Sequence, residues 1–241
     1  MITKAEFLKL SSKPATLNPK WAGGLWLDRY FTRKISPLAA YLLASVNVSA
    51  NIATLAFFAL GLFANLLLAI PVWWTPLAVL ALYAVVRVLD EADGRLARYF
   101  KTQSKFGEVL DIFSELLLHS TFFIALGIRL YLETESIWAL VLAGIGALPY
   151  LYEGPWVKLS DELVGPFEAS QPATFWSWMR TTYVNYDYIL TTALLVPILY
   201  GLQTLLNAPS LVLMFFALHV SLSFLIKVAL RFIFVFIKSG R

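Results

Sequence analysis

Apolar stretches separated by short polar or proline-containing breaks make up most of the chain from Asn51 onward. A helix needs about 20 predominantly apolar residues to cross a bilayer. By that measure the pattern predicts six spans, at residues 51–70, 76–99, 107–130, 137–154, 187–205 and 210–237. Pro149 predicts a kink in the fourth span, and Pro197 predicts an interruption of the fifth. We therefore expect an all-α, polytopic membrane protein with six transmembrane helices.

The segment before the first span has a different character. Residues 1–20 predict a polar tail without the apolar core of a signal peptide. Residues 21–36 mix aromatic and basic side chains, a combination typical of helices that lie at the lipid headgroups. Pro37 then opens a short continuation that ends at Val46. We expect an N-terminal interfacial helix in this part of the chain.

Two domains follow from this pattern. Residues 1–48 are expected to form a tail with the interfacial, juxtamembrane helix, and residues 49–241 to form the six-helix transmembrane domain. Within the second domain, residues 155–186 are polar and aromatic with several Pro and Gly breaks, which predicts a loop with surface helices.

Composition supports a membrane protein and also orients it. The chain is 59% hydrophobic and 14% charged, which is too apolar for an ordinary soluble domain. Seven Lys and Arg residues precede residue 35 and four more lie around the junction of the second and third spans, whereas the opposite side carries only Arg129. Basic segments stay in the cytoplasm, so we expect both termini there. The dispersed basic residues give no support for nucleic-acid binding, and the lack of Cys excludes thiol chemistry.

Acidic residues gather at the junction of the second and third spans. Asp90 and Asp93 are three residues apart and share a helix face, and Asp111 and Glu115 share a face of the next helix. A short polar loop allows these helices to pack antiparallel, which brings the four carboxylates to one rim of the membrane. Such a group needs a counter-ion, and oxygen ligands suit Mg²⁺, Mn²⁺ or Ca²⁺.

The neighbours of these carboxylates indicate the ligand. Gly94 and Ala97 have almost no side chain, so a bulky group can approach the backbone. Arg98 presents a planar fork of donors that matches phosphate or carboxylate. Residue chemistry therefore indicates a metal-bound diphosphate or nucleotide at a membrane surface.

Residues 90–115 resemble the signature of the CDP-alcohol phosphotransferase (CDP-alcohol phosphatidyltransferase) family. That signature is Asp, two residues, Asp-Gly, two residues, Ala-Arg, eight residues, Gly, three residues, Asp, three residues, Asp. The chain matches it, with every spacing kept, at Asp90, Asp93, Gly94, Ala97, Arg98, Gly107 and Asp111. It departs at the last position, where Glu115 stands in place of Asp.

The resemblance implies a function and a role for each motif residue. It implies a membrane enzyme of phospholipid biosynthesis that transfers a phosphatidyl or phospho-alcohol group from a CDP-linked donor to an alcohol hydroxyl and releases CMP. It also implies that the enzyme uses Mg²⁺ or Mn²⁺, often as two ions. It implies metal ligands at Asp90, Asp93, Asp111 and Glu115, with Glu115 also the catalytic base. It implies nucleotide binding by Asp90, Asp93, Gly94, Ala97, Arg98 and Gly107. It also implies a homodimer and makes residues 49–241 a catalytic domain. The Lys and Arg asymmetry predicts that its active site lies on the cytoplasmic side.

Three other charged residues lie in apolar surroundings, and the sequence allows two roles for each. Arg87 lies one turn before Asp90 and is expected either to hold that carboxylate or to extend to the cytoplasmic headgroups. Lys227 and Arg231 lie four apart in the sixth span and are expected either to bind the acceptor or to extend in the same way. His119 and His219 are not expected to bind metal.

Two other functions compete with the transferase. A membrane prenyltransferase also binds Mg²⁺ and diphosphate, but it normally has two separate Asp-rich motifs and more spans. A catalytically silent homologue that binds CDP and metal is the other alternative, and Glu115 is the residue that favours it. The sequence does not name the acceptor alcohol or the donor lipid.

Overall fold

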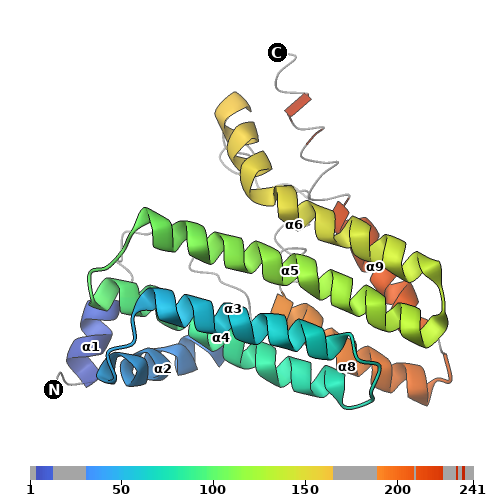
Figure 1. Ribbon diagram of the computed structural model, residues 1–241, viewed down its shortest axis with the longest axis horizontal. Helices are drawn as coiled ribbons and strands as arrows, with labels where there is room; N and C mark the ends of the chain where they lie inside the picture. The colour runs from blue at the N-terminus through green and yellow to red at the C-terminus, as the bar shows by residue number, and fades with distance from the viewer. Residues whose placement is uncertain are drawn as a thin grey trace, which may run out of the picture. The chain divides into compact units, whose positions relative to one another are not determined.

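The computed structural model describes residues 4–12, 31–164, 189–208, 210–224, 232 and 235–236. Every regular element within these residues is helical, which confirms the all-α class for this part of the chain. Figure 1 shows these helices in chain order. They are α1 (Lys4–Ser11), α2 (Arg33–Ser45), α3 (Ala50–Leu68), α4 (Thr75–Tyr99), α5 (Lys105–Thr134), α6 (Ile137–Val164), α8 (Ile189–Leu205) and α9 (Leu211–Phe224).

Several boundaries differ from the prediction because proline and polar residues are tolerated inside these helices. The predicted polar tail contains α1, and α2 continues through Pro37 without a break. Pro37 lies at the fifth residue of α2, where its missing N–H removes only one early backbone hydrogen bond. Helix α8 likewise continues through Pro197. Residues 21–30 of the predicted interfacial helix lie outside the described residues.

Helices α5 and α6 are longer than predicted. Helix α5 has 30 residues, and α6 runs to Val164, so the predicted loop at 155–186 begins with ten helical residues. Within the described residues, only α3 and α5 are long and apolar enough to cross a membrane by length and composition. Helix α4 does not qualify because the charged motif occupies its C-terminal half. The six-span topology stays a prediction.

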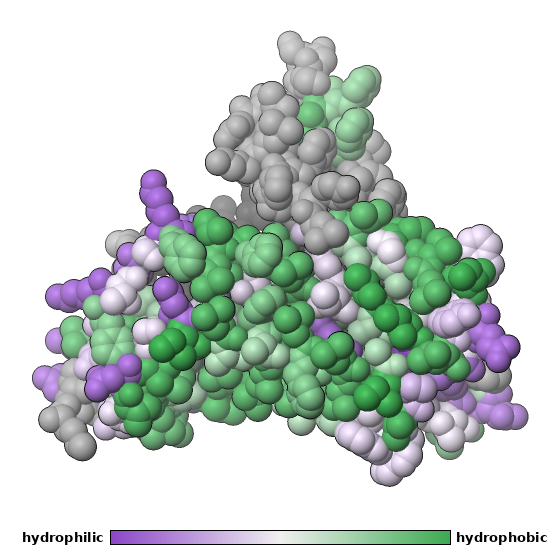
Figure 2. Space-filling model, in the orientation of Figure 1, coloured by the Kyte–Doolittle hydropathy of each residue, from purple (hydrophilic) through white to green (hydrophobic). Residues whose placement is uncertain are grey.

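The surface of the described helices carries many large apolar side chains, as Figure 2 shows for one face of the molecule. On α3, for example, Ile52, Leu55 and Leu66 are exposed. A soluble monomer rarely exposes apolar side chains so densely, whereas a helix in contact with lipid does so without cost.

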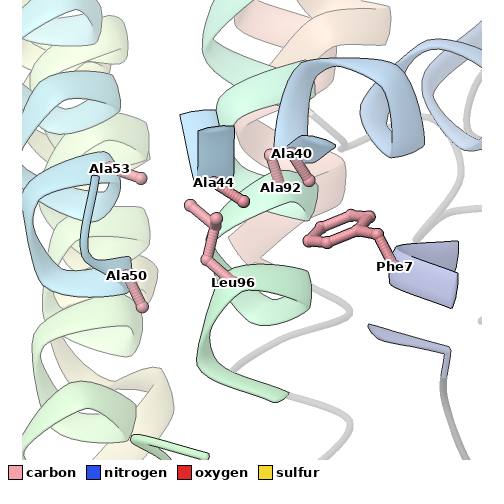
Figure 3. Close-up of a cluster of buried hydrophobic side chains, with 7 residues drawn as sticks. All are labelled: Phe7, Ala40, Ala44, Ala50, Ala53, Ala92 and Leu96. Atoms are coloured by element: carbon pink, nitrogen blue, oxygen red, sulfur yellow. The ribbon is translucent and has the colours of Figure 1, made fainter. Parts of the chain in front are cut away.

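The chain divides into two compact units. The first comprises Met1–Ala64 with Ala81–Glu115, and the second comprises Asn65–Leu80 with Leu116–Arg241. The first unit contains the whole acidic motif. Its apolar core joins α1, α2, α3 and α4 through Phe7, Ala40, Ala44, Ala50, Ala53, Ala92 and Leu96 (Figure 3).

The second unit holds Arg129, the one basic residue that the predicted topology assigns to the non-cytoplasmic side. Arg129 is only 2% exposed and lies on α5. Its Nε donates to the Tyr200 hydroxyl at 2.8 Å and pairs with Glu133 Oε1 at 2.8 Å. Its Nη atoms donate to carbonyls of the α3–α4 turn, including Ile70 O at 2.8 Å. This arginine therefore ties α5 and α8 to a turn whose carbonyls lack helical partners.

Four of the described helices are followed by a left-handed residue that is not glycine, and two of these residues lie in the first unit. Lys101 follows α4 with φ 54°, and Asn47 follows α2 with φ 58°. The Thr102 N–H then donates back to Ala97 O at 2.9 Å, which closes the end of α4. Residues 102–104 of this turn line the same cavity as the motif residues Asp93 and Gly94.

Candidate functional site

Three of the four predicted carboxylates meet in the first unit. Asp90 and Asp93 lie on α4, and Asp111 lies on the second turn of α5. One carboxylate oxygen from each lies within 4.8 Å of the others. Two oxygen ligands on opposite sides of Mg²⁺ are about 4.2 Å apart, so small side-chain movements would bring all three onto one ion.

The hydrogen bonds around this cluster leave room for a cation. Thr54 on α3 donates to Asp93 Oδ2 at 2.5 Å, and both residues are buried. Arg87 Nη1 pairs with Asp90 Oδ2. Asp111 Oδ1, in contrast, is buried and has no hydrogen-bond partner. A buried carboxylate oxygen without a donor is costly unless something positive binds it, so this donor set fits a divalent cation.

A cavity of about 480 Å³ opens beside Asp93 and Asp111. Its volume lies within the range of small-molecule sites, roughly 300–1,000 Å³. Its lining comes from the start of α3, the end of α4, the following turn and the start of α5, and includes the motif residues Asp93, Gly94, Ala97, Arg98, Gly107 and Asp111. The structure therefore brings most of the predicted nucleotide residues to one cavity.

Two helix N-termini also border this cavity. Ser49 caps α3 by accepting a hydrogen bond from the Ile52 N–H at 3.4 Å. Ser104 caps α5 by accepting one from the Gly107 N–H at 3.0 Å. Helix N-termini carry partial positive charge and favour phosphate groups, and Arg98 and Lys105 add full charges to the same lining. The cavity thus combines a cation site with groups that attract an anion.

The motif glycines keep this space open. A Cβ at Gly94 would meet Nη1 of Arg98 at 3.4 Å, which places that guanidinium beside Gly94 at the cavity. A Cβ at Gly107 would lie 3.4 Å from both Asn51 Oδ1 and Ser104 Oγ. Larger side chains at either position would occupy the volume that a ligand needs.

Glu115 lies outside the group of three. Its side chain is 46% exposed, and its Oε1 lies 3.8 Å from Arg87 Nη1. Because Arg87 Nη1 also pairs with Asp90, this arginine links Glu115 to the metal cluster. The predicted contact between Arg87 and Asp90 is therefore present, whereas direct metal binding by Glu115 stays a prediction.

Sequence reasoning missed the contribution of α3. Asn51 and Thr54 both line the cavity, and Thr54 also binds Asp93. The available signal was their spacing of three, which puts two polar side chains on one face of an apolar helix. The sequence pattern marks Asn51 only as the first residue of the first predicted span, and it does not distinguish Thr54.

Some predicted residues lie elsewhere. Lys227 and Arg231 lie outside the described residues, so acceptor binding by them stays a prediction. In the second unit, His119 stacks on Tyr150 with ring centroids 4.8 Å apart. His219 stacks on Phe123 at 5.5 Å. Neither histidine belongs to an acidic cluster within the described residues.

Comparison with protein families shows which family the chain belongs to. The family model for CDP-alcohol phosphatidyltransferases matches residues 46–169, which is about half of the chain and contains the complete motif. The chain belongs to the CDP-alcohol phosphatidyltransferase family. A search of curated proteins gives no match. Family membership supports phospholipid head-group transfer as the general activity and disfavours the prenyltransferase alternative.

Family membership also suggests a role for the three-carboxylate cluster in metal binding. Enzymes of the CDP-alcohol phosphatidyltransferase family are integral to the membrane and typically depend on divalent metal. In this member, Asp90, Asp93 and Asp111 are positioned so that they could bind such an ion. The exposed apolar helices agree with a membrane location.

Proposed function

We propose that this protein transfers a phosphatidyl or phospho-alcohol group from a CDP-linked donor to an alcohol hydroxyl and releases CMP. The observation that carries the proposal is the placement of three carboxylates beside a cavity bordered by two helix N-termini. A cation at the carboxylates and phosphates at the N-termini together suit a metal-bound diphosphate.

Asp90, Asp93 and Asp111 would hold Mg²⁺ or Mn²⁺, with two ions as the family resemblance implies. When bound, the metal offsets the negative charge that accumulates on the departing CMP. Thr54 and Arg87 hold Asp93 and Asp90 in place through the contacts described above. The buried free oxygen of Asp111 completes the ligand set.

The remaining motif residues bind the nucleotide part of the donor. Gly94, Ala97 and Gly107 leave the cavity open, and Arg98 provides donors for a phosphate. Lys105 adds positive charge at the start of α5. These residues orient the donor so that the phosphorus farther from cytidine faces the acceptor.

Glu115 acts as the general base. The acceptor oxygen forms a new bond to the phosphorus farther from cytidine in the diphosphate, and the bond from that phosphorus to the bridging oxygen breaks. CMP leaves with the bridging oxygen, and Glu115 takes the proton of the acceptor hydroxyl. The half-exposed side chain of Glu115 suits a group that exchanges protons with solvent between turnovers.

A catalytically silent relative is the second candidate. The contact between Glu115 and Arg87, together with the absence of Glu115 from the three-carboxylate group, favours it. A base held by an arginine is less available for proton transfer. Such a protein would bind CDP and metal without turnover.

The reaction belongs at the cytoplasmic membrane surface. The proposed topology has six spans with both termini and the active site in the cytoplasm, where CDP-linked donors are present. Its support is the asymmetry of Lys and Arg along the sequence. We extend the proposal to membrane lipids as partners, to a homodimer and to Lys227 and Arg231 as acceptor-binding residues.

The deciding experiment measures CMP release by the purified protein in lipid with Mg²⁺ or Mn²⁺. CDP-diacylglycerol would be offered with glycerol 3-phosphate, inositol phosphate, inositol or serine, and a CDP-amino-alcohol with diacylglycerol. We expect metal-dependent release with one pairing, and a loss of about 10²-fold or more in Asp93→Asn and Glu115→Gln. Glu91→Gln is the control, because Glu91 pairs with Arg95 at 3.6 Å and lies outside the cluster. Metal-dependent CDP binding without release from any pairing would favour the silent relative.

A further inference from the structure

Helix α1 is anchored to the first unit by one aromatic side chain. Phe7 is fully buried and packs among α2 and α4, as Figure 3 shows. Its ring lies 4.8 Å from the ring of Tyr99 and 5.8 Å from that of Tyr41, measured between centroids. Burial of a phenylalanine is a strong source of docking energy for a helix of only eight residues.

The C-terminal end of α1 contacts a residue of the cavity. Nε of Arg98 donates to the main-chain carbonyl of Ser11, the last residue of α1, at 2.8 Å. A helix leaves its last carbonyls without internal partners, so this carbonyl is a natural acceptor for an arginine. The bond leaves the two Nη groups of Arg98 for other partners, and one of them lies beside Gly94 at the cavity.

We propose that α1 is a positioning element for nucleotide binding, acting through Arg98. This inference rests on the proposed function, because it assigns a CDP-type ligand to the cavity. Docked α1 holds the guanidinium through Nε, so the long side chain loses less freedom when its Nη groups bind phosphate. Helix α1 lies outside residues 46–169, the segment that the family model matches. The coupling is therefore a property of this chain's own N-terminal segment.

Binding of CDP in the presence of Mg²⁺ tests the coupling by isothermal titration in lipid nanodiscs. Phe7→Ala removes the anchor of α1 and leaves every cavity residue intact. We expect it to weaken CDP binding on the order of 5- to 20-fold, the lower part of the range typical of coupled sites. In turnover assays it should raise the KM for the donor and leave kcat nearly unchanged, a split that general destabilisation would not give.

Two substitutions in α1 serve as matched controls. Ser11→Ala keeps the carbonyl that Arg98 uses and removes a buried hydroxyl that has no hydrogen-bond partner. Leu10→Ala trims a side chain that is 55% exposed on the same helix. Both should bind CDP as the unchanged protein does.

A second measurement starts from the unchanged protein. If α1 docking strengthens CDP binding, CDP must strengthen α1 docking by the same factor. Hydrogen exchange of the α1 amides should therefore slow when CDP and Mg²⁺ are added. Arg98→Lys, which lacks Nε, should abolish this added protection.

The outcomes separate the inference from the proposed function. If the unchanged protein fails to bind CDP, the nucleotide function fails and the inference with it. Suppose that the unchanged protein binds CDP, but Phe7→Ala binds it equally well or the hydrogen exchange of the α1 amides does not change when CDP is added. Either result overturns the inference and leaves the proposed function standing. Weaker binding in Phe7→Ala with normal binding in both controls, together with slower α1 exchange, supports the coupling.

Discussion

Thr54 shows how one hydroxyl can support a metal site. It is the only donor within the described residues seen to approach Asp93 from another helix, at 2.5 Å. A donor of this kind fixes the orientation of a carboxylate and so lowers the cost of organising it around an ion. The residue matters for the cluster although it belongs to no motif.

We expect Thr54→Val to weaken Mn²⁺ binding by roughly 10- to 100-fold, the usual cost of losing a group that orients a metal ligand. Valine keeps the shape of threonine and removes the hydroxyl, which contacts Asp93 Oδ2 and Ala50 O of its own helix. Titration of the purified protein with Mn²⁺, followed by electron paramagnetic resonance, measures this. Ser114→Ala is the control, because the Ser114 hydroxyl donates to Leu110 O of its own helix. Equal Mn²⁺ affinity in Thr54→Val and the unchanged protein would rule out the orienting role.

Arg87 is the basic residue that pairs with two of the motif acids, Asp90 and Glu115. In the absence of metal it supplies positive charge to a group of acids that repel one another. Arg87→Gln removes that charge. We therefore expect the free energy of unfolding to fall by about 1–3 kcal/mol when a chelator is present. Mg²⁺ should restore part of this loss, because the ion replaces the missing charge.

Thermal unfolding in detergent, with EDTA or with Mg²⁺, measures the effect of Arg87→Gln. Arg95→Gln is the comparison, because Arg95 pairs with Glu91 and not with the cluster. Its loss of stability should be the same in EDTA and in Mg²⁺. A loss in Arg87→Gln that Mg²⁺ does not change would show that Arg87 does not balance the metal site.

At the scale of elements, α5 and α6 pack through a small residue. A Cβ at Gly127 would overlap the Cβ of Ala143 and lie 2.8 Å from Ala139 O. Backbones that approach this closely are typical of helix pairs in membranes, where small residues replace bulky apolar ones at the contact. The sequence shows the glycine but not the helix that it faces.

We expect Gly127→Ala to destabilise the protein by about 1–3 kcal/mol, because the added methyl group must push the two backbones apart. For a chain of this size, each kcal/mol lowers the Tm by roughly 2–4 °C. Gly144→Ala is the matched control, because a Cβ there meets nothing within 4 Å. Thermal unfolding of both variants measures the difference, and equal Tm values would contradict close α5–α6 packing.

For the whole molecule, the open question is how the chain crosses the membrane. The chain contains no Cys, so single cysteines can report each side without background labelling. With six spans and cytoplasmic termini, Lys9→Cys should react with a membrane-impermeant maleimide only from the cytoplasmic side. Trp73→Cys, in the α3–α4 turn at a position that is 82% exposed, should react only from the other side. Reaction of both from one side would overturn the topology.

The sequence by itself determined the helical class, most helix positions and the acidic motif with its family. These features are local: apolar periodicity marks a helix, and spacings of three and four place residues on one face. The same local reasoning erred at Pro37 and Pro197, because a proline predicts a break although packing can hold a helix together around it. Local reasoning also missed α1, because half of its residues are polar and only one large apolar side chain, Phe7, is buried there.

Only the tertiary structure decided which side chains meet. It placed Asp111 with Asp90 and Asp93 and left Glu115 beside Arg87, although all four acids occupy the acidic positions of the motif. It brought Thr54 to Asp93 and the Ser11 carbonyl to Arg98 across 39 and 87 residues of sequence. Contacts between residues so far apart depend on how helices pack, and a carbonyl acceptor carries no signature in the sequence because every residue has one.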